Sequence, residues 1–313
     1  MRKPVTAILT LVLATFIIGC GGGEKRTAPD TDSIARADSM ALKVGVLPTL
    51  DCLPLYVAEE KGIFDSIGVD VRLKYFDNSF DSDMAIMEGT IEGGVTDCVR
   101  AAWMAVKGCA VTPVSATNAY WQLVTNKKAR LSRLSEMTDK MIAMTRFSAT
   151  AMLADMAVDS SKIDKDYVFL IQINNPNTRL MMIQNNEMDA AMMAEPHASA
   201  ARADDHRVLM DSREKGLQLG AIVFSDATLC DERRRAQTEK FIRAYDIAVE
   251  EINKHGAKHF SDIIRRRMGV SDNVAAAIPD IKFDKASAPR TTDIDRAKEW
   301  IDKQNVKKGL EHR

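Results

Sequence analysis

LKVGVLPTLDCLPLYVAEEKGIFDSIGVDVRLKY, residues 42–75, is the stretch that decides the fold of this chain. Its first six residues, 42–47, are mostly apolar and short enough for a buried strand. A helical pattern follows at residues 55–61 and ends at Gly62, because glycine readily takes the left-handed conformation beyond a helix. The alternating apolar residues of 69–75 predict a second strand. A strand, a helix and a second strand in this order predict a parallel α/β sheet.

The same alternation continues along the chain. Further strands are expected at residues 93–96, 140–145, 167–173, 190–194 and 221–225, and helices at 81–88, 99–106, 149–158 and 177–184. Residues 111–124 are rich in strand-forming residues and predict a long crossing. After residue 225 the pattern is almost wholly helical, with helices expected at 231–254, 257–268, 271–278 and 292–304.

Two short segments are alike, IMEGTIEGGV at residues 86–95 and IQNNEMDAAM at residues 183–192. Each runs from a helix end through a residue that tolerates positive φ, Gly89 or Asn186, to an acid, two small residues and a strand. Any short loop between a helix and a strand can look like this. The likeness still favours two lobes of similar design, and 313 residues are long for one core.

The N-terminal segment predicts export. A basic pair at residues 2–3 precedes an apolar stretch at 5–18, which is shorter than the run of about 20 residues that crosses a bilayer. It is therefore expected to be a signal peptide, residues 1–20, rather than a membrane span. Its Ile-Ile-Gly-Cys ending resembles the lipobox of bacterial lipoproteins, which implies that Cys20 carries a lipid such as palmitate. The protein is then expected to work outside the cytoplasm, in the periplasm, at a bacterial membrane.

Residues 21–41 are Gly-rich and then polar, which is typical of a flexible tether. The net charge is −1 and the sequence pI about 6.5, so no overall field attracts nucleic acid or anionic lipid. Contact with the membrane is therefore expected through the lipid on Cys20.

The remaining cysteines, Cys52, Cys98, Cys109 and Cys230, contain no C-x-x-C and no nearby Cys/His pair, so no zinc site is expected. An exported protein can form disulfides, whose connectivity the sequence does not give, and buried free thiols are the alternative. No metal is expected at His255 and His259, which share a helix face but have no acid or third ligand beside them. No nucleotide cofactor is expected, since no P-loop and no G-x-G-x-x-G fingerprint is present.

Several motifs occur in an order that resembles a known family. The strand at 42–47 and its loop lead to LYVAEEKGIF at 55–64 and GVDV at 68–71. The series continues through residues 89–97, where Glu92 replaces the family's Asp, and ends in MDAAMMAEP at 188–196. This order resembles the solute-binding proteins of ABC importers, specifically the NMT1/THI5-like group (sulfonate, nitrate and thiamine-pyrimidine binding, SsuA-like). The resemblance spans about residues 42–225.

The resemblance implies an α/β fold of the periplasmic binding protein type II class. Two lobes are joined by two crossing strands, carry a helical C-terminal region and close on a ligand by hinge motion. Residues 42–120 and 221–313 are expected to form lobe I, and residues 121–220 lobe II. The crossings are expected near residues 116–124 and 220–225.

Ligands of open α/β sheets bind beyond the carboxyl ends of the strands, so the loops there supply the candidate ligand-binding residues. They are Thr49, Asp51, Cys52, Thr96, Asp97, Tyr120, Trp121, Arg146, Ser148, Thr150, Asn174, Glu195 and His197. Either ring of Tyr120 and Trp121 is able to stack on a planar heterocycle, although neighbouring strand residues point to opposite faces.

Two kinds of ligand remain open. Ser148 and Thr150 begin a helix beside Arg146, which favours a sulfonate or nitrate anion, although an ordinary Ser N-cap with a solvated Arg gives the same pattern. The acids Asp51, Asp97 and Glu195 favour an amine or aminopyrimidine instead, unless they are simply solvated.

The expected function is a lipid-anchored receptor, not an enzyme, that delivers a small polar solute to an ABC permease and its ATPase. An enzyme on the same scaffold is the alternative, although the Cys-rich motif of the yeast pyrimidine synthases is absent. A sensory lipoprotein without a transporter is the third possibility.

Overall fold

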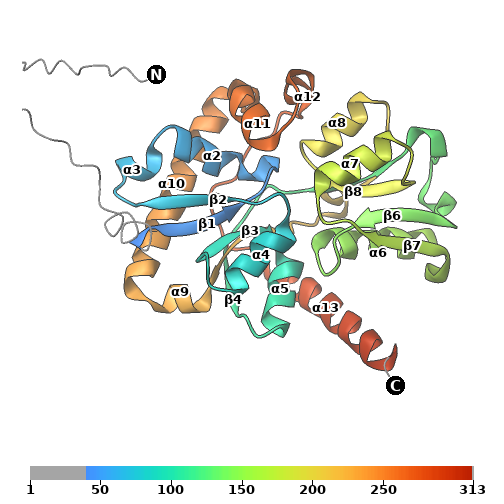
Figure 1. The fold of residues 1–313 in the computed structure, drawn as a ribbon, viewed down its shortest axis with the longest axis horizontal. Helices are drawn as coiled ribbons and strands as arrows, with labels where there is room; N and C mark the ends of the chain where they lie inside the picture. Colours follow the sequence, from blue (N-terminus) through green and yellow to red (C-terminus); the bar gives the residue numbers. More distant parts are fainter. Residues whose placement is uncertain (1–39, 312–313) are drawn as a thin grey trace, which may run out of the picture. The chain divides into compact units, whose positions relative to one another are not determined.

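The computed structural model describes residues 40–311 of the chain, with side chains described for residues 40–304. The expected signal peptide, the lipid-bearing Cys20 and nearly all of the expected tether lie outside the described residues. The described chain forms two lobes, each built on one five-stranded sheet with helices packed on it (Figure 1). None of the helices in this part of the chain is both long and apolar enough to cross a membrane.

The first sheet has the strand order β2-β1-β3-β10-β4. Its strands are β1 (Leu42–Val46), β2 (Val71–Tyr75), β3 (Gly93–Asp97), β4 (Val111–Ala116) and β10 (Gly220–Ser225). β1 is parallel to both β2 and β3, whereas β10 runs antiparallel to β3 and β4. The helices of this lobe are α2 (Leu53–Glu60), α3 (Ile63–Ser66), α4 (Ser79–Met87), α5 (Cys98–Val106), α9 (Asp226–Cys230), α10 (Glu232–His255), α11 (Ser261–Met268) and α12 (Asp272–Ala277).

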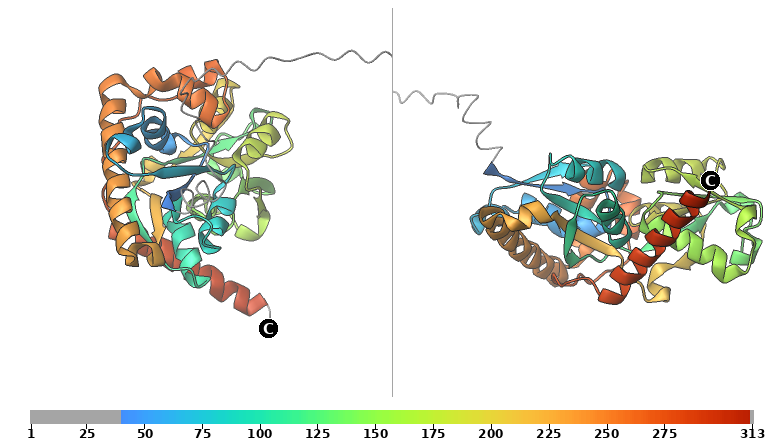
Figure 2. Two further views of the ribbon diagram at one scale, coloured as in Figure 1. Left: turned by 60° about the vertical axis from the view of Figure 1, so that its left-hand side comes forward. Right: turned by 90° about the horizontal axis from the view of Figure 1, so that it is seen from below.

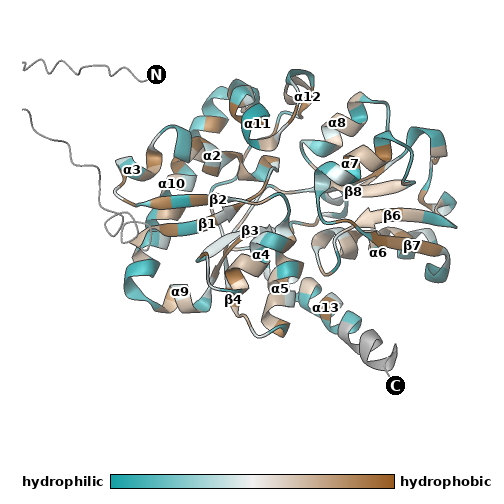
Figure 3. Ribbon diagram, in the orientation of Figure 1, coloured by the Kyte–Doolittle hydropathy of each residue, from teal (hydrophilic) through white to brown (hydrophobic). Residues whose placement is uncertain are grey.

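The core of the first lobe lies between the sheet and the helix pair α2 and α10. The ring of Phe241 in α10 stacks on Phe64 with centroids 5.8 Å apart and meets Phe224 of β10 edge-on at 5.6 Å. Burial of such large apolar side chains is the main stabilising contribution to a domain. Figure 3 shows the complementary pattern, with polar residues concentrated on the outward turns of the helices.

The second sheet has the order β7-β6-β8-β5-β9. Its strands are β5 (Trp121–Thr125), β6 (Lys140–Met144), β7 (Val168–Gln172), β8 (Ala190–Ala194) and β9 (Arg207–Asp211), and its helices are α6 (Ala149–Ser161), α7 (Pro176–Gln184) and α8 (His197–Ala203). β6 is parallel to β7 and β8, and β5 is antiparallel to β8 and β9. The two lobes therefore repeat one topology, with β5 and β10 in equivalent places.

The connections between the lobes differ in detail from the expected crossings. Residues 111–124 form two strands in different sheets, β4 and β5, joined by residues 117–120. β10 lies wholly in the first sheet, because both of its edges are paired there and its residues are buried. The expected crossing at 220–225 is therefore displaced to the residues before it, 216–219. The sequence could not show that β10 pairs with strands on both sides within the first sheet.

The helix α13 (Thr291–Glu311) contacts both lobes. It packs against α5 of the first lobe and α6 of the second, and Figure 2 shows it running beneath both of them. Its Trp300 donates from the indole nitrogen to a carboxylate oxygen of Asp155 in α6, at 2.9 Å. Its Ala297 and Ile301 belong to one apolar cluster that also contains Trp103 of α5 and residues of α6.

Candidate functional site

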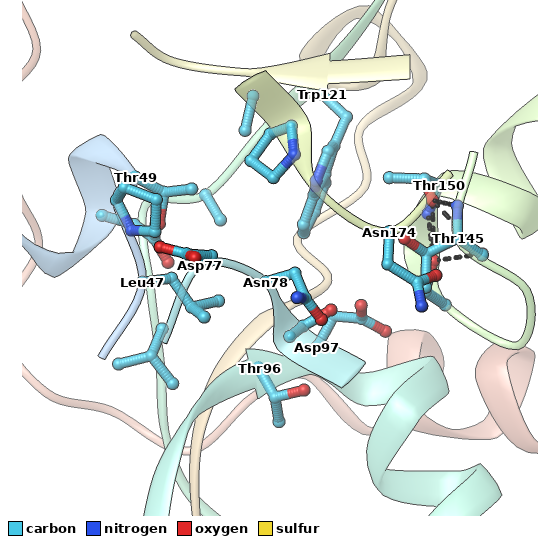
Figure 4. Close-up of a pocket in the computed structure, with 18 of the residues that line it drawn as sticks. Leu47, Thr49, Asp77, Asn78, Thr96, Asp97, Trp121, Thr145, Thr150 and Asn174 are labelled. Atoms are coloured by element: carbon cyan, nitrogen blue, oxygen red, sulfur yellow. Dashed lines mark hydrogen bonds between the residues drawn. The ribbon is translucent and has the colours of Figure 1, made fainter. Parts of the chain in front are cut away.

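A cavity lies between the two lobes, at the carboxyl ends of their strands (Figure 4). It has about 80 Å³ of space for the centres of water-sized molecules, which suits a small solute rather than a polymer. The first-lobe loops contribute Leu47, Pro48, Thr49, Asp51, Asp77, Asn78, Ser79, Val95, Thr96 and Asp97. The connection and the second lobe contribute Ala119, Trp121, Thr145, Ser148, Thr150, Asn174, Pro176, Arg179 and Ala194.

Eight of the thirteen residues expected from the sequence line this cavity. They are Thr49, Asp51, Thr96, Asp97, Trp121, Ser148, Thr150 and Asn174. The expectation that ligands bind beyond the carboxyl ends of strands therefore identified cavity residues that are up to about 125 positions apart in the chain.

Asp97 holds the first-lobe wall to the second lobe. It ends β3 and caps α5, with Oδ1 accepting from the backbone N–H of Arg100 at 2.9 Å. The same Oδ1 also accepts from the backbone N–H of Ala149 in α6, at 3.0 Å. Oδ2 accepts no hydrogen bond from any residue that the structure describes. The side chain is only 4% exposed, and this burial raises the pKa of Asp97 to about 7.

The raised pKa of Asp97 predicts a pH-dependent stability that Asp97→Asn removes. The stability linked to this carboxyl is fully present below its ordinary pKa of 3.8 and is lost as the pH rises through about 7. Urea unfolding of both proteins at about pH 5 and about pH 8 measures the difference. We expect the wild type to lose stability relative to Asp97→Asn between these two values. An unchanged difference would show that Asp97 has no shifted titration within this range.

Two further carboxylates stand on the same wall. Asp51 lies in the short helix η1 (Leu50–Cys52) and accepts at Oδ2 from the hydroxyl of Thr117, at 2.9 Å. It is buried, and burial raises its pKa. Asp77 lies in the loop after β2 and is exposed at the cavity rim.

On the second-lobe wall, backbone N–H groups in the first turn of α6 already donate hydrogen bonds to other groups of the protein. Ser148 caps the helix, its hydroxyl accepting from the N–H of Thr150 at 3.1 Å and donating to the carbonyl of Thr145 at 2.7 Å. The N–H of Ala149 donates to Asp97. The Arg146 side chain is exposed and does not line the cavity. Of the two interpretations left open by the sequence, these are the features of the ordinary Ser N-cap with a solvated Arg, and the carboxylate that meets this turn is that of Asp97.

Arg179, which the sequence did not indicate, is the cation of the cavity wall. It lies in α7, is 4% exposed and has no ion pair among the described residues. Its Nε donates to the carbonyl of Ile173 at 2.7 Å, its Nη1 to that of Met192 at 2.8 Å, and its Nη2 to the hydroxyl of Thr145. Burial lowers the pKa of Arg179 to about 9. The guanidinium therefore ties three chain segments together behind the wall.

Glu195 and Tyr120 lie beside the main cavity rather than on its wall. They line a smaller adjoining space that also touches Asp51. The Tyr120 hydroxyl donates to Glu195 Oε1 at 3.0 Å, and Arg202 Nη2 donates to the same oxygen at 2.6 Å. The N–H of Ser199 donates to Oε2 at 2.9 Å, so protein groups occupy both oxygens of Glu195.

Cys52 and His197 are buried away from the cavity. The sulfur of Cys52 accepts from the N–H of Leu47 at 3.4 Å, and burial raises the pKa of its thiol. His197 begins α8 and its Nε2 lies 2.9 Å from Oδ1 of Asn177. Burial and the charge of Arg179 lower the pKa of His197 to about 4, so it is neutral. Cys52, Cys98, Cys109 and Cys230 are all free thiols, which answers the disulfide question for the described chain.

Several wall residues were missed. Asp77, Asn78 and Ser79 follow the end of β2, so the same expectation about strand ends, applied to every expected strand, would have found them. Thr145 stands at the end of the strand expected at 140–145, so the same expectation would have found it. Arg179 gave no such signal, because a helical arginine usually reaches solvent.

The two lobes touch on both sides of the cavity. On one side the N–H of Leu50 donates to the carbonyl of Glu195 at 2.9 Å. On the other, the ring of Phe147 stacks on that of Trp103, with centroids 6.3 Å apart. Phe147 holds a positive φ of 54°, which is strained for a bulky residue and orients the loop toward the first lobe. This is the geometry of a closed cleft.

Comparisons with known proteins agree with this architecture. A protein-family model described as NMT1/THI5 like matches residues 49–258. A search of curated proteins found no match. The alkanesulfonate-binding protein SsuA from Xanthomonas axonopodis pv. citri, bound to MOPS, is 14% identical with a TM-score of 0.71, over 87% of this chain and 94% of that chain.

Two other solved structures share the fold. The periplasmic nitrate-binding protein NrtA from Synechocystis PCC 6803 is 14% identical with a TM-score of 0.67, over 75% of this chain and 68% of that chain. The desulfurization enzyme DSZB is 12% identical with a TM-score of 0.54, over 82% of this chain and 89% of that chain. One fold therefore serves both binding and catalysis in these proteins.

Proposed function

Because the chain belongs to the NMT1/THI5-like family, we propose that it is the solute-binding component of an ABC importer. It captures a small polar solute between lobe I, which contains β1 to β4 and β10, and lobe II, which contains β5 to β9, and hands it to the permease and its ATPase. The observation that carries this proposal is the cavity at the strand ends, whose walls come from both lobes. A solute that contacts both walls favours the closed arrangement over the open one.

Catalysis is the rival function. The structural likeness to the desulfurization enzyme is the observation that favours it. Covalent chemistry needs a nucleophile or a general base at the reacting atom. The cavity wall contains no Cys and no His among the described residues, and the neighbouring Cys52 keeps its proton because burial raises its pKa. Asp97, whose pKa burial raises to about 7, is a wall group that could serve as a base, but no hydroxyl or thiol of the described residues donates to it. The described wall therefore lacks an activated nucleophile, which favours a receptor over an enzyme.

A screen of small polar solutes by thermal shift tests the proposal. A ligand at about 100 times its Kd adds about 2.7 kcal/mol to the stability of the folded protein. We expect a hit that binds with one-to-one stoichiometry in calorimetry and leaves the solute chemically unchanged. Turnover of the bound solute would favour the enzyme, and a screen without hits would count against the receptor.

Lipid anchoring through Cys20 is part of the same proposal and gives a separate prediction. Replacing Cys20 by Ala removes the thiol that would carry the acyl chain, so the variant should leave the membrane fraction and stay soluble after export. Fractionation with Cys230→Ala as the control measures this, because Cys230 is an exposed free thiol far along the chain. A Cys20→Ala protein that stays with the membrane would refute the lipid anchor.

A further inference from the structure

The charges on the cavity wall are divided unevenly between the lobes. Three carboxylates line it, those of Asp51, Asp77 and Asp97, and all three belong to the first-lobe wall. The second-lobe wall has one charged group, Arg179. The space between the walls is therefore more favourable for a positive group than for a negative one.

Asp97 is the carboxylate best placed to meet a solute. It is 4% exposed, so the protein withholds most of it from water. Oδ1 is committed to the N–H groups of Arg100 and Ala149, whereas Oδ2 has no hydrogen-bond donor among the described residues. Figure 4 shows this carboxylate on the cavity floor in that view. This oxygen is not among the fully buried atoms left without a partner, so it is open to the cavity, where a solute N–H can donate to it.

Several of the N–H groups that would otherwise hold an anion are already in use. The N–H of Ala149 at the start of α6 faces Asp97, and the N–H of Thr150 faces Ser148. Three of the five N–H groups of the Arg179 guanidinium donate to groups of its own lobe. Above about pH 7, where Asp97 is ionised, an entering anion would also meet the carboxylates of Asp77 and Asp97, which repel it.

Trp121 supplies the second contact that a cation favours. Its ring reaches into the cavity from above in Figure 4, while Asp97 lies below. The face of an indole attracts a positive charge more strongly than that of any other aromatic side chain. A carboxylate and an indole face on one small cavity together match an ammonium group or a protonated heterocyclic nitrogen.

We propose that the cavity recognises its solute by a cationic nitrogen, which donates to Oδ2 of Asp97 and lies against the Trp121 ring. This inference rests on the proposed solute-binding function and adds the chemical class of the solute. The rest of the solute points to the hydroxyl and amide groups of Thr145 and Asn174 on the second-lobe wall. A zwitterion satisfies the same requirement, because it retains the cationic nitrogen.

Matched probes of one shape and opposite charge test the proposal by calorimetry. The probes are propylammonium against propanesulfonate, and benzylammonium against phenylmethanesulfonate, each titrated into the full folded protein at about pH 8, where Asp97 is ionised. We expect the ammonium of each pair to bind more tightly than its sulfonate, by at least about tenfold. Sulfonates that bind while ammoniums do not would overturn the cation inference and leave the receptor function standing. No binding of any of the four would count against both.

Asp97→Asn identifies the residue responsible. Asparagine keeps the acceptor oxygen for Arg100 and Ala149, so the cap and the contact between lobes persist while the charge is lost. We expect ammonium binding to weaken about 10- to 100-fold and sulfonate binding not to weaken. Asp65→Asn is the control, since Asp65 is an exposed acid on α3 outside the cavity. Equal ammonium affinity in both variants would overturn the assignment to Asp97.

Discussion

Replacing Arg100 by Met is expected to lower the free energy of unfolding by about 3–5 kcal/mol. Arg100 is fully buried, and its Nε lies 2.5 Å from Oδ2 of Asp83, which is also fully buried. Burial already raises the pKa of Asp83, and its Oδ1 has no hydrogen-bond partner in the described structure. Loss of the guanidinium leaves this carboxylate buried without a counter-charge. Urea unfolding monitored by circular dichroism measures the loss.

Two comparisons separate the buried pair from a general effect of losing an arginine. Arg265→Met removes an exposed arginine that pairs with Asp262, and this change should cost only about 0–1 kcal/mol. The double replacement Arg100→Met with Asp83→Leu removes both buried charges, so it should cost less than Arg100→Met alone. A double variant less stable than the single one would show that Asp83 has another role.

Glu195→Ala should destabilise the protein by about 2–4 kcal/mol and leave solute affinity nearly unchanged. Its carboxylate accepts from Tyr120, Arg202 and the N–H of Ser199, so its removal deprives three groups of their acceptor. The Glu195 side chain is only 1% exposed, and water cannot readily replace it. Thermal unfolding and calorimetry with the screened solute measure the two effects separately.

The control for Glu195 is Glu187→Ala, which removes an exposed glutamate from the turn before β8 and should change stability by less than about 0.5 kcal/mol. If the Glu195→Ala protein has normal stability but no longer binds solute, Glu195 contacts the ligand, as its position in the sequence suggested.

Strands and helices with a strong apolar period were predictable from the sequence. β1, β3, β6 and β8 lie within about a residue of their expected bounds. The helix α8 and the strand β9 were missed, because HASAARA has too little apolar content for a helical period and RVLMD is short and partly exposed. Packing against the rest of the second lobe, which local sequence does not encode, stabilises both elements.

For the site, the sequence could indicate loops but not the direction of each side chain. Asp51 and Glu195 both follow strands, yet Asp51 lines the main cavity whereas Glu195 turns to Arg202 and Tyr120. The Thr145–Thr150 loop was expected to receive an anion, and it receives the protein's own Asp97. Contacts of this kind join residues from different lobes, so no local pattern predicts them.

The position of α13 has a consequence for affinity. Because this helix packs on α5 and α6 together, opening the cleft must disturb part of that packing. The packing therefore contributes to the fraction of molecules that are closed before a solute arrives, and the apparent Kd varies inversely with the fraction of molecules in the binding-competent state. We therefore expect solute affinity to depend in part on Trp300 and its neighbours on α13, although Trp300 is not among the residues that line the cavity.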